Sequence, residues 1–114
     1  MWPEKDTLLE MVTFLSDIEN FVTGRTLNEF VNDDMFRSAV QYKLIIVGEA
    51  VTRLSKEFRK AHARIPWQKV ADYRNFSIHG YHAVDWIVVW KAATINAPIL
   101  KMQVRTILAL ELPS

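Results

Sequence analysis

The part of the chain richest in reactive side chains is the nine-residue stretch RNFSIHGYH, residues 74–82. It holds an arginine, an asparagine, two of the three histidines and a tyrosine, arranged around Gly80. A histidine with its ordinary pKa of about 6.5 can give or take a proton at neutral pH. An arginine is permanently charged and binds phosphate through its planar guanidinium group. These residue types favour chemistry on a phosphodiester.

Metal-free cleavage of RNA is the reaction that this set would suit. The 2′-hydroxyl attacks the neighbouring phosphorus and leaves a cyclic phosphate and a 5′-hydroxyl. Arg74 would stabilise the developing phosphoryl charge, His79 would move a proton, and Asn75 would orient the imidazole or hold a ribose or phosphate oxygen. A single histidine cannot readily serve as acid and base in one step. A symmetric dimer that brings two copies together would supply both roles.

A purely structural explanation of the same residues stays open. The helix dipole favours a histidine near a helix C-terminus, and solvent or a surface ion pair satisfies an arginine. On an ideal helix Asn75 and His79 share a face, whereas Arg74 and His79 are about 140° apart. Contact between the last two would need the chain to unwind at Gly80.

The end of the motif predicts an accessible tyrosine and no metal site. Tyr81 follows the glycine at a helix exit, where a side chain is expected to reach solvent. His79 and His82 lie on either side of Gly80, and no nearby carboxylate pair completes a set of metal ligands.

Half of the positive charge of the chain precedes this motif. Residues 1–52 hold four basic and nine acidic side chains, whereas residues 53–74 hold seven of the 14 basic residues against two acidic ones. A solvated helix face would explain this pattern, and so would an approach path for a phosphate-bearing partner. On the second interpretation the candidate RNA-binding residues are Arg53, Lys56, Arg59, Lys60 and Lys69.

The elements that must position the motif are helical throughout the first half of the chain. Apolar residues at helical spacing predict a first helix that stops at Gly24; they are Leu8, Val12, Leu15, Ile18 and Val22. Thr26 and Glu29 predict a capping box for a short helix over LNEFVN, and Asp33 or Asp34 then caps a long one. The seam of that long helix consists of Val40, Leu44, Val47, Val51, Leu54 and Phe58. Gly48 within it predicts close approach of a neighbouring backbone.

The second half predicts the helix that carries the motif and two helices after it. Pro66 suits the first turn of a helix through WQKVADYRNFSIH that stops near Gly80. Asp85 can cap a following helix, WIVVWKAAT. Asn96 and Pro98 predict a kink before a last amphipathic segment, residues 99–110. With three glycines, four prolines and no alternating strand pattern, we expect one all-α domain over residues 1–114, an antiparallel bundle of four to six helices with a kinked C-terminal helix pair.

Composition narrows the setting. The absence of cysteine excludes disulfides and thiolate metal sites and suits a reducing compartment. The N-terminal MWPEKDTLLEM is acidic where a signal peptide needs a basic segment. The most apolar stretch, VDWIVVWKAATINAPIL, is interrupted by polar residues and Pro98, so it is too short and too polar to span a bilayer. We therefore expect a cytoplasmic protein without membrane contact.

The string from Arg74 to Tyr81 is the R-x4-H-x-Y motif of the HEPN superfamily, and the chain resembles its HepT toxin family. The resemblance extends through VGEA, TRLSKEFRKAHARIPWQKVADYRN, the start of the next helix and INAPIL, from about residue 9 to 110. It implies a HEPN-like bundle that dimerises with both motifs facing a shared cleft. It also implies a metal-independent endoribonuclease without cofactor, the toxin of a type VII-like toxin–antitoxin pair, acting on RNA such as tRNA or mRNA.

The resemblance implies a role for each motif residue. Arg74 and His79 become the catalytic pair and Asn75 a supporting group. Tyr81 becomes the acceptor of AMP, which a cognate minimal nucleotidyltransferase antitoxin transfers to silence the toxin. AMP at this position would add bulk and negative charge beside Arg74 and so block an anionic substrate.

This chain departs from the family pattern at four positions. Tyr42 and Ile45 replace an arginine and a glutamate of the long helix, and they predict either a partner surface or, the interpretation we favour, core residues. Phe76 and Ser77 replace a basic and an apolar residue inside the motif. Glu49 matches the family, but solvent exposure or an ion pair would explain it equally. Two other functions therefore remain open: a non-catalytic module that binds a nucleotide or a nucleotidyltransferase, and a plain structural bundle.

Overall fold

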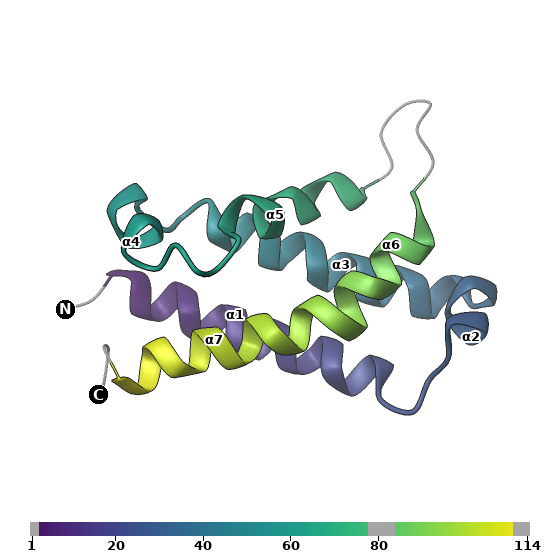
Figure 1. Ribbon diagram of the computed structural model, residues 1–114. Helices are drawn as coiled ribbons and strands as arrows, with labels where there is room; N and C mark the ends of the chain where they lie inside the picture. Colours follow the sequence, from purple (N-terminus) through teal and green to yellow (C-terminus); the bar gives the residue numbers. More distant parts are fainter. Residues whose placement is uncertain (1–2, 78–83, 111–114) are drawn as a thin grey trace.

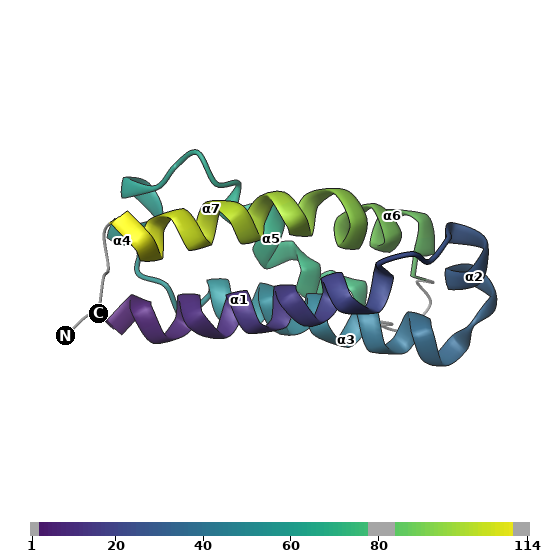
Figure 2. The ribbon, with the colours of Figure 1, turned by 90° about the horizontal axis from the view of Figure 1, so that it is seen from below.

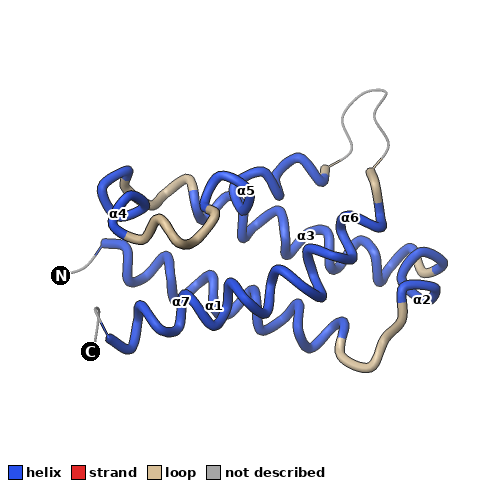
Figure 3. The backbone as a smooth tube through the Cα atoms, viewed as in Figure 1, coloured by secondary structure: helices blue, strands red, loops and turns tan. Residues whose placement is uncertain are grey.

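The computed structural model of the protein describes residues 3–77 and 84–110, and its regular structure there is entirely helical (Figures 1 and 3). The all-α prediction is confirmed. In chain order the elements are α1 (Pro3–Val22), α2 (Leu27–Asn32), α3 (Asp34–Val51), α4 (Lys56–Ala61), α5 (Trp67–Ala71), the 3-10 helix η1 (Asp72–Phe76), α6 (Trp86–Lys91), the π-helical segment η2 (Ala92–Asn96) and α7 (Ala97–Leu110).

The long helices form an antiparallel bundle. α1 lies between α3 and α7 and runs opposite to both, and α5–η1 packs along α3 (Figures 1 and 2). α2 covers one end of the bundle, and α4 lies at the other end, beside the beginning of α1 and the end of α7 (Figure 1). The motif helix is therefore held against α3, with α6, η2 and α7 on its other side.

The capping signals in the sequence work as predicted. The Thr26 hydroxyl accepts from the Glu29 N–H at 3.1 Å while Glu29 accepts from the Thr26 N–H at 2.9 Å, and this backbone hydrogen bond lowers the pKa of Glu29. Asp33 caps α3 by accepting from the N–H of Phe36, and Asp85 caps α6 by accepting from two backbone N–H groups. Gly24 lies in the turn that follows α1 and has a φ of +75°, a value that favours glycine.

Burial follows the predicted helical faces. Leu8, Leu15 and Ile18 of α1 are buried, together with Met11, which lies on the same face. They meet the predicted seam of α3 and the inner face of α7, where Leu100, Val104 and Ile107 are buried. Apolar area removed from water is the main stabilising contribution in such a bundle.

The long helix α3 ends before the apolar seam that predicted it: the seam runs to Phe58, whereas the helix stops at Val51. α3 ends at Val51 because the chain tightens into three-residue turns, in which the N–H groups of Arg53 and Leu54 bind carbonyls three residues back. Ser55 then caps α4 through the N–H of Phe58, which starts a separate helix. Leu54 is still buried and Phe58 half-buried, so the apolar pattern continues after the helix has ended.

The motif helix also ends earlier than predicted. Helical structure stops at Phe76, and Ser77 is extended with a ψ of 152°. Two side chains take the carbonyls that a longer helix would use: the Ser77 hydroxyl donates to the Arg74 oxygen at 3.1 Å, and Gln41 Nε2 donates to the Phe76 oxygen at 2.6 Å. The prediction of a continuous helix to Gly80 is wrong for this reason, and the predicted shared face of Asn75 and His79 involves a residue outside the described ranges.

Two further predictions change in detail. The π-helical segment η2, which ends at Asn96, joins α6 to α7. Pro98 lies in the first turn of α7, where a proline is tolerated. Tyr42 is 61% exposed and is not a core residue, because it lies on the outer face of α3, while Ile45 is half-buried.

Within the two described ranges, no helix is long and apolar enough to cross a bilayer.

Candidate active site

Arg74 lies in η1 and presents its guanidinium to solvent. Its Nε donates to the Ala71 carbonyl at 3.0 Å, which fixes the direction of the side chain, while the residue as a whole stays exposed. Because one N–H is tied to its own helix, the other donors of the guanidinium remain for an anion. Asn75 follows in the same turn and is also exposed.

Gly48 of α3 supports the backbone beneath Arg74. A Cβ at this position would lie 3.0 Å from the carbonyl oxygens of Val70 and Ala71 and 3.1 Å from the Arg74 nitrogen. The absence of a side chain therefore allows two helices to touch backbone to backbone. The predicted close approach is confirmed, and its partner is the helical turn that carries the motif arginine.

Gln41 fixes the last residue of η1. Its side chain is part-buried and donates to the Phe76 carbonyl, as described above. With Gly48 two turns further along α3, the motif turn is held at two points by one rigid helix. Such support favours precise positioning of a functional group.

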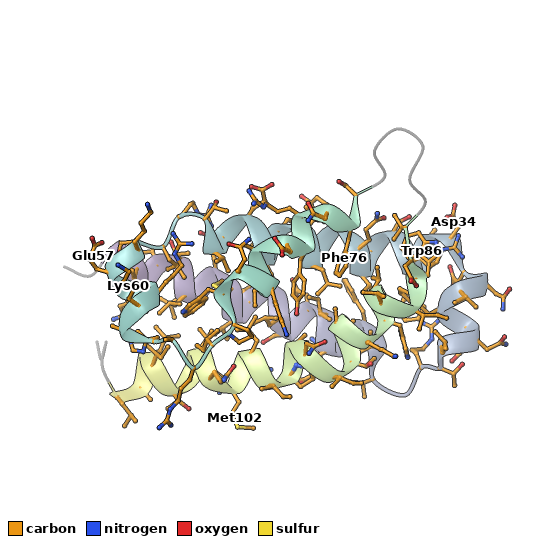
Figure 4. All side chains as sticks on the ribbon, turned by 45° about the horizontal axis from the view of Figure 1, so that its top comes forward. Asp34, Glu57, Lys60, Phe76, Trp86 and Met102 are labelled. Atoms are coloured by element: carbon orange, nitrogen blue, oxygen red, sulfur yellow. The ribbon has the colours of Figure 1, made fainter. Side chains whose placement is uncertain are left out.

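The first helix after the motif, α6, begins in a cluster of aromatic side chains. Trp86 begins α6 and packs edge-on against Phe30, with ring centroids 6.0 Å apart. The Arg37 guanidinium lies over the Trp86 ring, 5.1 Å from its centroid, and also pairs with Asp34 at 3.0 Å. Figure 4 shows Asp34 close to Trp86 on this side of the molecule. Arg37 and Gln41 are one turn apart on α3, so the same helix contacts the chain on both sides of residues 78–83.

Two predicted site residues, His79 and Tyr81, lie outside the described residues. The structure therefore locates Arg74 and Asn75 of the predicted set. Across residues 3–77 and 84–110, no group of three histidine, aspartate or glutamate side chains could hold a metal ion.

The predicted RNA-binding residues divide between two places. Lys69 lies on α5, one turn before Tyr73 and close to the motif, and it is exposed. Lys56, Arg59 and Lys60 lie on α4, and Figure 4 shows Lys60 at the end of the molecule away from Phe76. Arg53 pairs with Glu10 at 3.2 Å. Within one copy of the chain, Lys69 is thus the candidate nearest the motif.

Sequence reasoning missed the side of η1 that faces away from α3. Tyr73 is buried there, and burial raises the pKa of its phenol to about 12. Tyr73 and Phe76 stack with ring centroids 5.4 Å apart and planes 16° apart. The spacing of Val70, Tyr73 and Phe76 is a helical apolar face that could have revealed this side. Gln41 carries no sequence signal for its role.

Comparisons with known proteins identify the family of the chain. Residues 11–107 match the family described as Ribonuclease HepT-like. The chain is similar to "Putative RNase TTE0752" of Caldanaerobacter subterraneus subsp. tengcongensis, with 37% identity over 96% of this chain and 95% of that protein. It is also similar to "Putative RNase MJ1380" of Methanocaldococcus jannaschii, with 32% identity over 90% of this chain and 94% of that protein.

A third relative carries the family name itself. It is "Probable ribonuclease HepT" of Thermococcus cleftensis, 34% identical over 85% of this chain and 88% of that protein. No solved structure matches the chain significantly. The matched range includes α3, with Gly48 and Gln41, and the entire motif. The chain belongs to the HepT-like ribonuclease family.

Proposed function

We propose that the protein is a metal-independent endoribonuclease and that Arg74 and His79 are its catalytic residues. The observation that carries this proposal is the setting of Arg74: an exposed guanidinium on a turn that α3 holds backbone to backbone. A charge held in place before substrate arrives stabilises a transition state without reorganisation. Asn75, exposed in the same turn, supports the site by holding a ribose or phosphate oxygen.

The reaction balances with two histidines. One imidazole takes the proton of the 2′-hydroxyl as its oxygen attacks phosphorus. A second imidazole protonates the leaving 5′-oxygen as the P–O5′ bond breaks, which gives a 2′,3′-cyclic phosphate and a 5′-hydroxyl. Arg74 neutralises charge on the non-bridging oxygens. Since each chain has one His79, a homodimer with both motifs at a common cleft supplies the pair.

The outer face of the C-terminal helices supports such a dimer. Ile95 and Met102 are 55% and 69% exposed and lie two helical turns apart. Figure 4 shows Met102 projecting away from α7. Exposed apolar side chains along one face are typical of an interaction surface. Ile87 of α6, 52% exposed, extends this apolar character toward the motif.

The biological role that we propose is that of a toxin silenced by modification. A nucleotidyltransferase antitoxin would transfer AMP to the Tyr81 hydroxyl, with loss of pyrophosphate from ATP. The added phosphate would lie close in sequence to Arg74 and compete for it with the RNA backbone.

The test of catalysis is RNA cleavage by purified protein in the presence of EDTA. Arg74→Ala and His79→Ala should each reduce the rate by about 100-fold or more, the usual effect of removing a transition-state contact. Arg105→Ala, which removes an exposed arginine from α7, serves as the matched control. Equal cleavage by His79→Ala and the unmodified protein would exclude the assigned role.

The test of modification is the intact mass of the peptide that contains Tyr81. The peptide is isolated from cells with and without the neighbouring nucleotidyltransferase. A mass increase of one or more AMP units, absent in Tyr81→Phe, supports the modification. An unmodified peptide beside an active nucleotidyltransferase would exclude it, and would leave the non-catalytic binding module as the competing function.

A further inference from the structure

A groove of about 600 Å³ lies beside the motif, between α5–η1 and the helices α6, η2 and α7. One wall is the face of the motif helix that includes Lys69, Tyr73 and Phe76, and the other includes Lys91, Asn96 and Gln103. The volume lies within the range of small-molecule sites, roughly 300 to 1,000 Å³. In Figure 4, Phe76 appears between the ribbons of η1 and α6.

Tyr73 brings a phenol hydroxyl to the groove. The residue is 8% exposed and lines the groove. Within residues 3–77 and 84–110 its hydroxyl makes no hydrogen bond, and its oxygen is not one of the buried side-chain atoms that lack a partner, so it is open to the groove. A phenol is protonated at neutral pH and can donate a hydrogen bond to a ligand there. The groove thus contains a donor on the wall formed by the motif helix.

The other polar groups of the groove are equally available. The amides of Asn96 and Gln103 and the ammonium groups of Lys69 and Lys91 make no hydrogen bond or ion pair with another described residue. An amide offers a donor and an acceptor, as the edge of a nucleobase does. An ammonium group binds phosphate. The stacked rings of Tyr73 and Phe76, with Val88 and Ile99 opposite, provide the apolar walls that a base needs.

The groove lies next to the catalytic turn, because both are built on η1. Tyr73 directly precedes Arg74, and consecutive Cα atoms are about 3.8 Å apart. Phe76 directly follows Asn75. Along η1, the two residues that would hold a base therefore flank the two residues that would hold the reacting phosphate. A nucleotide in the groove would place the RNA backbone beside the guanidinium.

We propose that this groove binds one unpaired nucleotide of the RNA, with the base between Tyr73–Phe76 and α7 and a phosphate near Lys69 and Lys91. The proposal rests on the proposed ribonuclease function, because it makes the groove the part of the site that selects the base. The amides of Asn96 and Gln103 read the base edge, and the Tyr73 hydroxyl donates one hydrogen bond to the base or the ribose.

Calorimetric titration of the full-length protein with the four 5′-mononucleotides tests the groove directly. We expect one or two of them to bind more tightly than the others. Tyr73→Phe should weaken that binding about tenfold, the effect of one hydrogen bond. Lys91→Gln should weaken nucleotide binding more than nucleoside binding. Arg105→Gln, which removes a charge from α7 outside the groove, is the matched control.

Three outcomes would contradict the proposal that the groove binds a nucleotide. They are equal binding of all four mononucleotides and inorganic phosphate, equal weakening by Arg105→Gln and Lys91→Gln, and unchanged binding in Tyr73→Phe. Thermal unfolding of each variant separates loss of binding from loss of folding. Gln103→Leu adds a second readout, since it should change the preferred base at the cleavage site without abolishing cleavage.

The same material separates this proposal from the ribonuclease function. Arg74→Ala, which changes no residue that lines the groove, should keep the order of preference among the four mononucleotides while cleaving RNA at least about 100-fold more slowly. If the protein binds nucleotides but never cleaves RNA, the proposed ribonuclease function is wrong and the proposed nucleotide site stands. Cleavage by a protein that binds no mononucleotide, with its base preference unchanged in Gln103→Leu, would exclude the groove and retain catalysis.

Discussion

The two sides of η1 are built in opposite ways. The side facing α3 is closed: Gly48 admits the backbone of Val70 and Arg74 to contact distance, and Gln41 binds the carbonyl of Phe76. The side facing α6 and α7 is open, with a groove, a buried phenol and amide and ammonium groups that have no partner among the described residues.

The difference separates support from recognition. Backbone contact cannot adapt, so the closed side fixes the position of Arg74. Polar groups that face solvent and not a protein partner can exchange their water for a ligand, so the open side suits binding. One short helical segment thus serves both purposes, and each side can be altered without the other.

Replacing Gly48 by valine should break the closed side and have the largest effect. The Cβ alone would meet three backbone atoms at 3.0 to 3.1 Å, and backbone cannot rotate away. We expect a loss of about 3 kcal/mol in the free energy of unfolding, the upper part of the range for overpacking. The urea midpoint measures it, and RNA cleavage should fall as Arg74 is displaced.

Ser38→Val is the control for this variant, because it places the same β-branched residue at an exposed position of α3. It should cost only a few tenths of a kcal/mol. Gly48→Ala should fall between the two, since a gain of roughly 1 kcal/mol in helix propensity offsets part of the clash. Equal stability of Gly48→Val and Ser38→Val would show that the two helices can separate freely.

Replacing Gln41 by leucine should weaken the closed side at its end. The variant keeps most of the side-chain volume but leaves the part-buried Phe76 carbonyl without its donor. An unsatisfied group of this kind costs about 1 to 3 kcal/mol. Chemical denaturation measures the loss, with Gln68→Leu as control because its bond to Asp72 is exposed. A larger loss in the control would contradict the assigned role of Gln41.

The sequence predicts the closed side of η1 better than the open side. Gly48 was recognisable because a glycine inside a regular apolar seam has a packing explanation more often than a conformational one, and the structure supplies its partner. The caps at Thr26, Asp33 and Asp85 were recognisable because they depend on residues one to three positions away. Local signals of this kind survive folding unchanged.

Tertiary contacts explain what the sequence did not predict. The ends of α3 and of η1 depend on which donors reach the last carbonyls, and Gln41 is 35 residues from Phe76 along the chain. Tyr42 is apolar enough for a core but lies on the outer face of α3, a choice set by packing. The groove arises between two helices that the sequence could place only in order, so its polar lining was not predictable.

Tyr73 allows the open side to be examined by pH. Its pKa rises from 10.0 to about 12 through burial, so the folded state keeps a proton that the unfolded state releases in this range. Stability is therefore complete below pH 10 and falls as the pH rises toward 12, by about 1.4 kcal/mol per unit. Tyr73→Phe should lose less stability than the unmodified protein from pH 9.5 to 11, as urea denaturation would show. Parallel curves would contradict a buried phenol.

Removing single charges should have the smallest effect on folding and should distinguish the open side from the distant α4. Lys69→Gln and Lys60→Gln both remove an exposed ammonium group, so each should change stability by less than about 0.5 kcal/mol. RNA affinity should separate them. A phosphate contact contributes about one unit to the slope of log affinity against log salt, and Lys69 lines the groove whereas Lys60 lies at the far end of the molecule. Lys69→Gln should therefore flatten the slope by about one unit while Lys60→Gln leaves it unchanged. The opposite result, measured on short single-stranded RNA, would move the RNA path from the groove to α4.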